Sequence, residues 1–397
     1  MRPGWEIKTL GDISVMMADG PFGSNLKKEH YTENREVRII QLSNIGEDGW
    51  REENTKYTTF KHLETIKRSE VFPNDIVIAK MMPAGRAIIC PNHEKKFVLS
   101  SDAVKVQLKK GINLRFAWYS INSPYFRKQV YENVAGSGRV RTSLTKLKVC
   151  KLRLPSLPEQ QRIVDILDQE FAKIDALKAN AEKSLQAAKD LFSQMLSQTF
   201  ANPSWSRKRI GDVFDTGAGG TPLKTYKEYY ENGNVPWLRS GEVCRKYITE
   251  TEMFITQLGM DNSSAKLFPE NTIVVAMYGA TAGQVGILHL ETTTNQAVCG
   301  IFPRTDYIPE FVYYSLLNSK KGLVAQATGN AQPNISQIKI KNTSIPVVSR
   351  EEQELVVARL DDLNDKCNVL QDNYQKTLSL CDDLKQSLLR KAFNGEL

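Results

Sequence analysis

The chain has 397 residues, of which 41% are apolar and 25% charged, and its formal net charge is +8. This balance is typical of globular proteins and excludes collagen-like and disordered classes. The length predicts two or three domains. No apolar run approaches the roughly 18 residues of a membrane span, and the N-terminal residues lack a signal-peptide core, so we expect a cytoplasmic protein with no membrane partner.

Short β-branched runs alternate with polar and glycine-rich loops over residues 1–154, and this pattern predicts a first globular domain of the α/β (α+β) class. Runs at 37–40, 76–79 and 103–108 indicate strands, and residues 114–131 have a helical pattern. Residues 203–350 predict a second domain of the same class, with strands at 273–276 and 297–302 and a helix at 309–323.

A long helix is predicted after each domain, over residues 155–202 and 351–397. Neither 159–200 nor 352–393 contains proline or glycine. Apolar residues recur every seven positions, as in a coiled-coil seam, at Leu167, Ile174, Ala181, Ala188 and Met195, and at Leu360, Cys367, Tyr374, Cys381 and Leu388. Leu177 and Leu191, and Leu363, Leu370 and Leu384, form adjoining rows. We expect the two helices to pack on each other in antiparallel fashion.

The two domain-plus-helix units are copies of one pattern, so the chain has a pseudo-two-fold internal repeat. Trp5 with Leu10-Gly11-Asp12 recurs as Trp205 with Ile210-Gly211-Asp212. Glu159-Gln160 at the start of the first long helix recurs as Glu352-Gln353.

The positive charge is concentrated in the domains. Residues 1–154 hold 27 Lys and Arg against 16 Asp and Glu, and residues 203–350 hold 15 against 12, whereas the helical segments are acidic. Basic domains joined by acidic helices favour binding of a polyanion by the domains.

A glycine-containing loop in each domain is the most specific candidate for base reading. Arg139 and Arg141, followed by Lys146, suit guanine edges, because a guanidinium can donate two hydrogen bonds to guanine. In the second copy Asn330 and Gln332 align with Arg139 and Arg141, and such amides suit adenine. We therefore expect the two domains to read different sequences.

Other loops with basic, amide and aromatic residues add candidate DNA contacts. In the first domain they are Asn25, Lys27, Lys28, Tyr31, Gln41, Asn44, Lys80 and Arg86. In the second they are Thr221, Lys224, Tyr226, Lys227, Arg239, Arg245, Tyr278 and Asn334.

No catalytic or metal-binding constellation is visible. The six cysteines form no Cys-x-x-Cys pair, there is no Gly-x-x-x-x-Gly-Lys-Ser/Thr phosphate loop, and the four histidines are scattered. We expect a binding protein without catalytic residues. Two alternatives stay open: a stand-alone DNA methyltransferase, since Asn202-Pro203-Ser204-Trp205 is similar to an Asn-Pro-Pro-aromatic adenine-holding loop, and a coiled-coil scaffold without DNA specificity.

Taken together, the repeat resembles the specificity subunit of type I restriction-modification systems over essentially the whole chain. The most specific segments are Leu152 to Val164 and the C-terminal Leu389-Arg390-Lys391-Ala392-Phe393-Asn394-Gly395-Glu396-Leu397.

The resemblance implies that each domain reads one half of a bipartite site in double-stranded DNA, and that the helices set the spacing. It implies two modification subunits as partners, which methylate adenine at N6 with S-adenosylmethionine, and restriction subunits that use ATP and Mg to cleave DNA. This chain itself would bind no cofactor. Residues near the helix starts would help hold the modification subunits, namely Glu159, Gln160, Gln161, Glu352 and Gln353.

Overall fold

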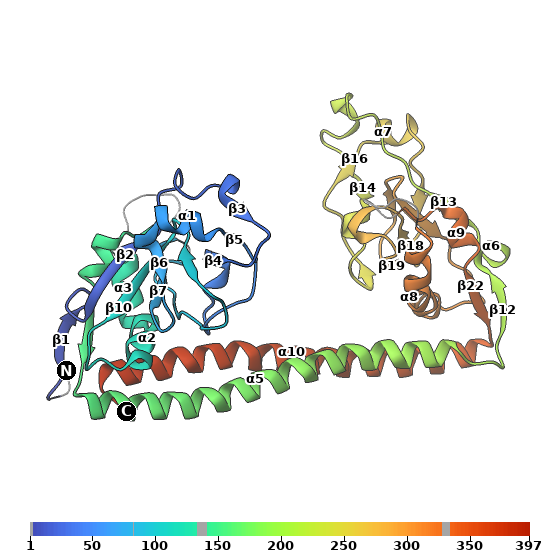
Figure 1. Ribbon diagram of the computed structural model, residues 1–397. Helices are drawn as coiled ribbons and strands as arrows, with labels where there is room; N and C mark the ends of the chain where they lie inside the picture. Colours follow the sequence, from blue (N-terminus) through green and yellow to red (C-terminus); the bar gives the residue numbers. More distant parts are fainter. Residues whose placement is uncertain (1–2, 82, 133–140, 328–333) are drawn as a thin grey trace. The chain divides into compact units, whose positions relative to one another are not determined.

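In the computed structural model, the described residues are 3–81, 83–132, 141–327 and 334–397. They form two compact units, one made of Met1–Glu182 with Lys376–Leu397 and the other of Lys183–Gln375. Each unit therefore holds one globular domain and a part of each long helix (Figure 1).

Two sheets and a strand pair build the domain of the first unit. Its strands are β1 (Glu6–Thr9), β2 (Ser14–Asp19), β3 (Tyr31–Thr32), β4 (Val37–Ile40), β5 (Tyr57–Thr58), β6 (Glu70–Val71), β7 (Ile76–Ala79), β8 (Ala87–Ile89), β9 (Phe97–Leu99), β10 (Ala103–Leu108) and β11 (Lys151–Leu154). One sheet has the order β2-β10-β7-β8 and the other β3-β5-β4-β9-β6. All these pairs are antiparallel except β4 and β9, where Ile39 lies opposite Val98 in a parallel pair. Strands β1 and β11 pair antiparallel.

The helices of this domain are α1 (Phe60–Thr65), α2 (Leu114–Asn122), α3 (Pro124–Glu132) and α4 (Leu144–Lys148), with 3-10 turns η1 (Lys28–His30), η2 (Leu42–Asn44) and η3 (Lys67–Ser69). The single helix predicted over 114–131 is in fact two helices. Ser123 between them is extended, with φ −70° and ψ 152°, because the ring of Pro124 disfavours helical backbone in the preceding residue.

The second unit repeats this plan. Its strands are β12 (Ser206–Arg209), β13 (Thr216–Ala218), β14 (Val235–Leu238), β15 (Tyr247–Ile248), β16 (Phe254–Ile255), β17 (Leu267–Phe268), β18 (Ile273–Ala276), β19 (Val285–Leu288), β20 (Thr292–Thr294), β21 (Val298–Ile301) and β22 (Ser344–Val347). The sheets have the orders β13-β21-β18-β19-β15 and β16-β14-β20-β17, and β12 pairs with β22. Strands β14 and β20 run parallel, as β4 and β9 do.

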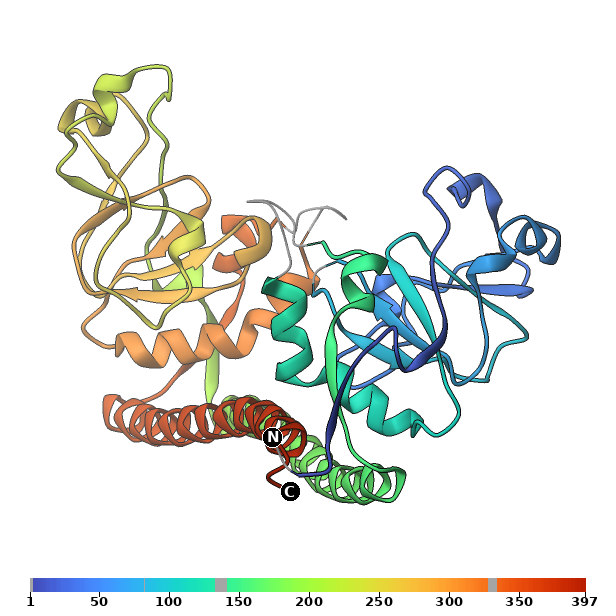
Figure 2. The ribbon, with the colours of Figure 1, turned by 90° about the vertical axis from the view of Figure 1, so that its left-hand side faces the viewer.

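The second domain has the helices α6 (Ile210–Val213), α7 (Gln257–Asp261), α8 (Pro309–Ala325) and α9 (Gln337–Lys341), with η4 (Lys227–Tyr229), η5 (Ser240–Glu242) and η6 (Gly279–Thr281). Figure 2 shows α8 between the sheets and the long helices. Phe311 and Tyr314 of α8 share a core with Leu196, Phe200 and Leu360 of those helices. Packing of α8 thus joins the domain to the helical part of its own unit.

The long helices are α5 (Leu157–Phe200) and α10 (Arg350–Asn394), which confirms both predicted helices. In the first unit Leu167, near the start of α5, shares a core with Phe393 at the end of α10. In the second unit Phe200, at the end of α5, shares a core with Leu360 near the start of α10. The helices therefore run antiparallel, as predicted, and the fold class of two α/β (α+β) domains with coiled-coil helices is confirmed.

The fully buried part of the seam consists mainly of residues from the seven-residue rows, and Leu363 of an adjoining row is half-buried. Leu167, Ile174, Leu360, Cys367 and Cys381 are buried. In contrast, the side chains expected on the adjoining rows at Leu177, Leu191, Leu370 and Leu384 are exposed. The antiparallel pair is thus narrower than predicted, and it leaves apolar residues on its outer surface. Among the described residues, no helix combines the length and apolar character needed to cross a membrane.

Candidate nucleic-acid interface

A surface hollow lies at the carboxyl end of the parallel pair β4 and β9 in the first domain, and another lies at the carboxyl end of the parallel pair β14 and β20 in the second, which also has the parallel pair β15 and β19. In the first domain, Gln41 follows β4 and Ser100 follows β9; in the second, Arg239 follows β14 and Asn295 follows β20. The two hollows have volumes of about 460 and 450 Å³. Loops that follow neighbouring parallel strands meet at one sheet edge, where α/β proteins commonly bind ligands. The repeat thus places one recess at the same site in both copies.

The linings of the two hollows are chemically different. The first is lined by Leu26, Tyr31, Gln41, Leu42, Ser43, Asn54, Lys56, Ser100, Ser101 and Asp102. The second is lined by Thr221, Lys224, Tyr230, Trp237, Arg239, Met253, Asn295 and Gln296. After the second strand of each pair, Ser100 and Ser101 stand where the second copy has Asn295 and Gln296. After the first strand, Gln41 stands where the second copy has Arg239, and Asp102 is a carboxylate that the second lining lacks. Each set offers hydrogen-bond donors and acceptors beside apolar side chains.

Two groups in the second hollow are held in place by neighbours. The Arg239 guanidinium donates to Glu242 Oε1 at 3.2 Å and also pairs with Glu252. The Thr221 hydroxyl donates to the side-chain oxygen of Gln296. The positive charge of Arg239 is therefore largely compensated by two carboxylates, which accept hydrogen bonds from its Nε and Nη2.

A second pair of equivalent segments is bridged to the residues that follow β7 and β18. Arg141 forms an isolated antiparallel bridge with Met81, the second residue after β7, and Asn334 forms the same bridge with Tyr278, the second residue after β18. The structural counterpart of Arg141 is therefore Asn334, which corrects the expected alignment of Arg141 with Gln332. The Arg141 guanidinium lies 3.5 Å from the Asp102 carboxylate.

The N-caps of the short helices α4 and α9, which follow these bridges, support the alignment of Arg141 with Asn334. Ser143 accepts a hydrogen bond from the amide of Lys146 at 3.3 Å, and Ser336 accepts one from the amide of Lys339 at 3.4 Å. Each serine is thus the N-cap of its helix, a role that serine fills well. In both copies the bridging residue lies two positions before the cap.

Most of the sequence-predicted DNA contacts lie at the surface. The exposed ones are Asn25, Lys27, Lys28, Arg141, Lys224, Tyr226, Lys227, Arg245, Tyr278 and Asn334. The half-buried ones are Tyr31, Gln41, Arg86, Lys146, Thr221 and Arg239. Arg139, Asn330 and Gln332 lie outside the described residues.

Two predicted contacts are structural residues. Asn44 is fully buried, its side-chain oxygen accepts from the amide of Gln41 at 2.9 Å, and its side-chain nitrogen donates to the carbonyls of Arg51 and Glu53 at 3.0 and 2.5 Å. Lys80 is buried and pairs with Asp19 at 2.7 Å. Both side chains are thus withdrawn from the open surface and engaged by partners within the chain, and a contact of either one with DNA stays a prediction.

Arg86 is neither fully buried nor exposed. Its side chain is mostly buried, with Nε 3.9 Å from Glu47. Burial lowers the pKa of Arg86, an effect that the Glu47 carboxylate opposes and the Arg127 guanidinium reinforces. The residue therefore contributes to a packed charge cluster more than to an open surface.

The residues expected to hold partner subunits make contacts within the chain instead. Gln353 is fully buried: Oε1 accepts from the amide of Ile308 at 2.8 Å, and Nε2 donates to the carbonyls of Asp306 and Val348 at 3.0 and 3.2 Å. Gln160 does the same in the first copy, where it accepts from the amide of Asn113 and donates to the carbonyl of Pro155, both at 2.9 Å.

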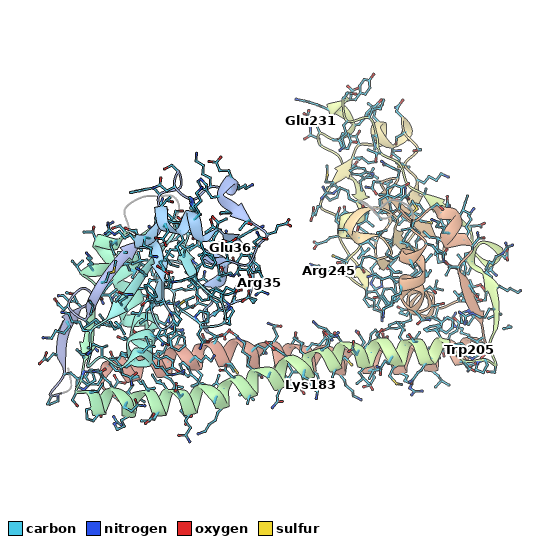
Figure 3. The ribbon with its side chains drawn as sticks, in the orientation of Figure 1. Arg35, Glu36, Lys183, Trp205, Glu231 and Arg245 are labelled. Atoms are coloured by element: carbon cyan, nitrogen blue, oxygen red, sulfur yellow. The ribbon has the colours of Figure 1, made fainter. Side chains whose placement is uncertain are left out.

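These two glutamines therefore fasten the start of each long helix to its domain, and a contact of either one with a partner subunit stays a prediction. The neighbouring predicted residues are also engaged. Glu352 accepts from the indole of Trp205 at 2.7 Å, where Figure 3 shows Trp205 at the passage from α5 into β12. Gln161 accepts from the side chain of Asn113 at 2.7 Å, and Glu159 pairs with Arg162 at 2.7 Å.

Sequence reasoning missed the residues that follow the second strand of each parallel pair, namely Ser100, Ser101, Asp102, Asn295 and Gln296. The sequence did contain a signal for these positions, because each group directly follows a short buried run, Phe97–Leu99 in the first copy and Thr292–Thr294 in the second. The pairing of that run with a strand about sixty residues earlier along the chain was not visible, however. Among the described residues, no group of three or more His, Cys, Asp or Glu side chains is arranged to hold a metal ion.

Comparisons with known proteins agree with this architecture. A family model described as the type I restriction modification DNA specificity domain matches residues 3–187 and again residues 202–379. The specificity subunit of the type I restriction enzyme EcoR124I/EcoR124II of Escherichia coli is 27% identical over 234 residues, which cover 57% of this chain and 56% of that protein. The match thus spans about half the length of that relative.

Two further similarities extend over the full chain. The StySPI specificity subunit of Salmonella potsdam is 23% identical over 431 residues, which cover 99% of this chain and 89% of that protein. A chain from a structural study of complex assembly and conformational transition of the type I R-M system has the same fold, with a TM-score of 0.79 at 18% identity over 100% of this chain and 99% of that one. The chain therefore belongs to the family of type I restriction-modification specificity proteins, and it contains two copies of the DNA specificity domain.

Proposed function

We propose that each domain reads one half of an asymmetric bipartite site in double-stranded DNA. The observation that carries this proposal is the pair of equivalent hollows with different polar linings. A shared frame with different donors and acceptors is what two readers of different sequences need, because base pairs differ in the hydrogen-bonding pattern of their edges. Asn295 and Gln296 suit an adenine edge, whereas Ser100 and Ser101 at the same two positions of the first copy are hydroxyls with shorter reach.

In this proposal, affinity and selectivity come from different residues. The exposed lysines Lys27, Lys28, Lys224 and Lys227 contact phosphates and supply sequence-independent binding. The side chains that line the hollows, together with Arg141 and Asn334 on the bridged segments, contact base edges. Binding should therefore weaken steeply with salt, and the preference among sequences should depend on the hollows.

The paired helices are proposed to set the gap between the two half-sites. The 44 residues of α5 correspond to ~66 Å at 1.5 Å per residue. Dimeric DNA readers fix half-site spacing through a rigid connection between their reading elements, and here the repeat would supply both readers within one chain.

The outer surface of the helices is proposed to dock two modification subunits. Large apolar side chains are exposed there, at Leu157, Leu177, Leu191, Leu355, Val369, Leu370, Leu380 and Leu384. Eight exposed large apolar side chains along two otherwise charged helices favour an interface with another protein. The chain itself carries out no chemical step in this proposal. Its modification partners bring S-adenosylmethionine and methylate adenine N6, and restriction partners bring ATP and Mg for cleavage.

A comparison of DNA methylation in cells with and without the gene tests the proposal. We expect one bipartite motif with unequal halves to carry N6-methyladenine only when the gene is present. An unchanged methylome, in cells that express the chain with its modification subunits, would contradict the proposal. Calorimetric binding of S-adenosylmethionine to the purified chain alone would favour a stand-alone methyltransferase, and equal binding of duplex DNA and other polyanions would favour a scaffold.

A further inference from the structure

Each domain carries a highly exposed apolar side chain at an equivalent position. Phe22 is 83% exposed and Leu223 is 63% exposed. Both directly follow a buried proline, Pro21 in the first copy and Pro222 in the second. A single exposed apolar residue needs no explanation, since such residues are common on protein surfaces. An exposed apolar residue at the same position in both copies, however, suggests a function.

The backbone around both residues is built in the same way. The carbonyl of Phe22 accepts from the amide of Asn25 at 2.7 Å, and the carbonyl of Leu223 accepts from the amide of Tyr226 at 3.1 Å. Each apolar residue is therefore the first residue of a hydrogen-bonded turn. We call the segments 21–25 and 222–226 the apolar tips.

A similar 3-10 turn follows each apolar tip. Residues 28–31 read Lys-Glu-His-Tyr and residues 227–230 read Lys-Glu-Tyr-Tyr, although the spacing from the apolar residue differs by two positions. The hydroxyl of Tyr230 donates to the carbonyl of Pro222 at 2.5 Å and thereby fixes the base of the second tip. The two copies thus differ in the number of residues between the apolar tip and the 3-10 turn. Both copies nevertheless have an exposed apolar side chain in the tip, so this side chain, and not the loop length, is the feature they share.

The tips lie among the residues proposed to contact DNA. Lys27 and Lys28 follow the first tip, and Lys224 and Lys227 lie within and just after the second; all four are exposed. In the first unit, β3 and the turn before it lie at the end of the domain away from α5 and α10 (Figures 1 and 2). In the second unit, Glu231 next to η4 lies at the corresponding end (Figure 3). The tips are thus remote from the proposed partner-docking surface.

We propose that Phe22 and Leu223 are wedges, each of which inserts between two adjacent base pairs of the half-site that its domain reads. This inference rests on the proposed function. Exposed apolar side chains that are flanked by cations insert into base steps in several DNA-bending proteins, where they unstack the bases. Enzymes that modify a base must extrude it from the duplex and bear the cost of unstacking. A wedge in each half-site would lower that cost for methylation by a partner subunit.

The test uses the full-length chain in complex with its modification subunits, and duplexes that carry the methylated motif with 2-aminopurine at single positions. The fluorescence of 2-aminopurine rises when its neighbours unstack. We expect the wild-type complex to brighten the probe at one step in each half-site. Phe22→Ala should abolish the signal in one half only, and Leu223→Ala in the other. Each should weaken binding about tenfold, which corresponds to about 1.4 kcal/mol, and Phe22→Trp should keep the signal.

Val15→Ala is the matched control, because Val15 is also in the first unit and is 71% exposed. It should behave like the wild type, and all variants should keep the wild-type melting temperature because the replaced side chains are exposed. A probe signal that Phe22→Ala leaves unchanged would overturn the inference. Loss of modification subunits from the purified complex, with an unchanged probe signal, would overturn it in favour of a protein-binding tip. If the wild-type complex shows no preference for the motif in anisotropy titrations, the proposed function fails as well.

Discussion

Replacement of Gln353 by leucine tests whether this residue fastens the helix to its domain or contacts a partner. Leucine has a similar volume, so Gln353→Leu removes hydrogen bonds without leaving a large cavity. Gln353 makes three hydrogen bonds to the backbone, with Ile308, Asp306 and Val348. At about 1 kcal/mol for each bond, we expect the second unit to lose about 3 kcal/mol of unfolding free energy.

The first copy supplies an internal comparison. Gln160 makes two backbone hydrogen bonds, with Asn113 and Pro155, so Gln160→Leu should cost about 2 kcal/mol in the first unit. Gln161→Leu is the control, because Gln161 is exposed and such substitutions usually change stability by less than about 0.5 kcal/mol.

Urea unfolding, together with hydrogen exchange, measures these effects. The amide of Ile308 should exchange faster in Gln353→Leu, and the amide of Asn113 should exchange faster in Gln160→Leu, because each amide loses its acceptor. The reasoning is refuted if Gln353→Leu changes the unfolding free energy by less than about 0.5 kcal/mol while the modification subunits no longer copurify. That result would indicate that Gln353 contacts a partner subunit.

Three further predictions concern charged side chains. Arg141→Ala should relax base preference at one half-site only, by about 1 to 3 kcal/mol in competition titrations, whereas an equal loss on all sequences would make Arg141 a phosphate contact. Lys27→Ala should lower the slope of log K against log salt by about 0.9, and an unchanged slope would remove Lys27 from the interface. The Lys385 ammonium pairs with the carboxylates of Asp48 at 2.9 Å and Asp175 at 2.6 Å. Lys385→Met should lower the unfolding free energy measured in urea by only about 1 to 2 kcal/mol, because both carboxylates stay partly solvated. The control Lys376→Met, at an exposed lysine, should lower it by less than about 0.5 kcal/mol.

The repeat and the long helices were predictable because local sequence determines them. Segments without proline or glycine and with a seven-residue apolar period favour a helix that packs against another helix. The break at Ser123 was also encoded, by Pro124. The exposure of Leu177, Leu191, Leu370 and Leu384 on the adjoining rows was not predictable, because spacing alone does not tell how wide a contact two helices share.

The candidate site was predictable only in part, because long-range pairing decides which polar residues meet. Gln41 and Ser100 lie side by side only through the parallel pairing of β4 with β9. Gln160, Gln353 and Asn44 were expected at the surface because they are polar. They are buried because each satisfies backbone groups that would otherwise lack a partner, and sequence patterns do not show which backbone groups need one.

The most direct test of the account is the methylated motif of cells that carry the double variant Asn295→Ala with Gln296→Ala. We expect the motif to lose base preference in one half, while the other half and the gap between them stay as in the wild type, because each domain reads its own half-site. A motif in which both halves change, or in which neither half changes although the variant complex still methylates DNA, would contradict it.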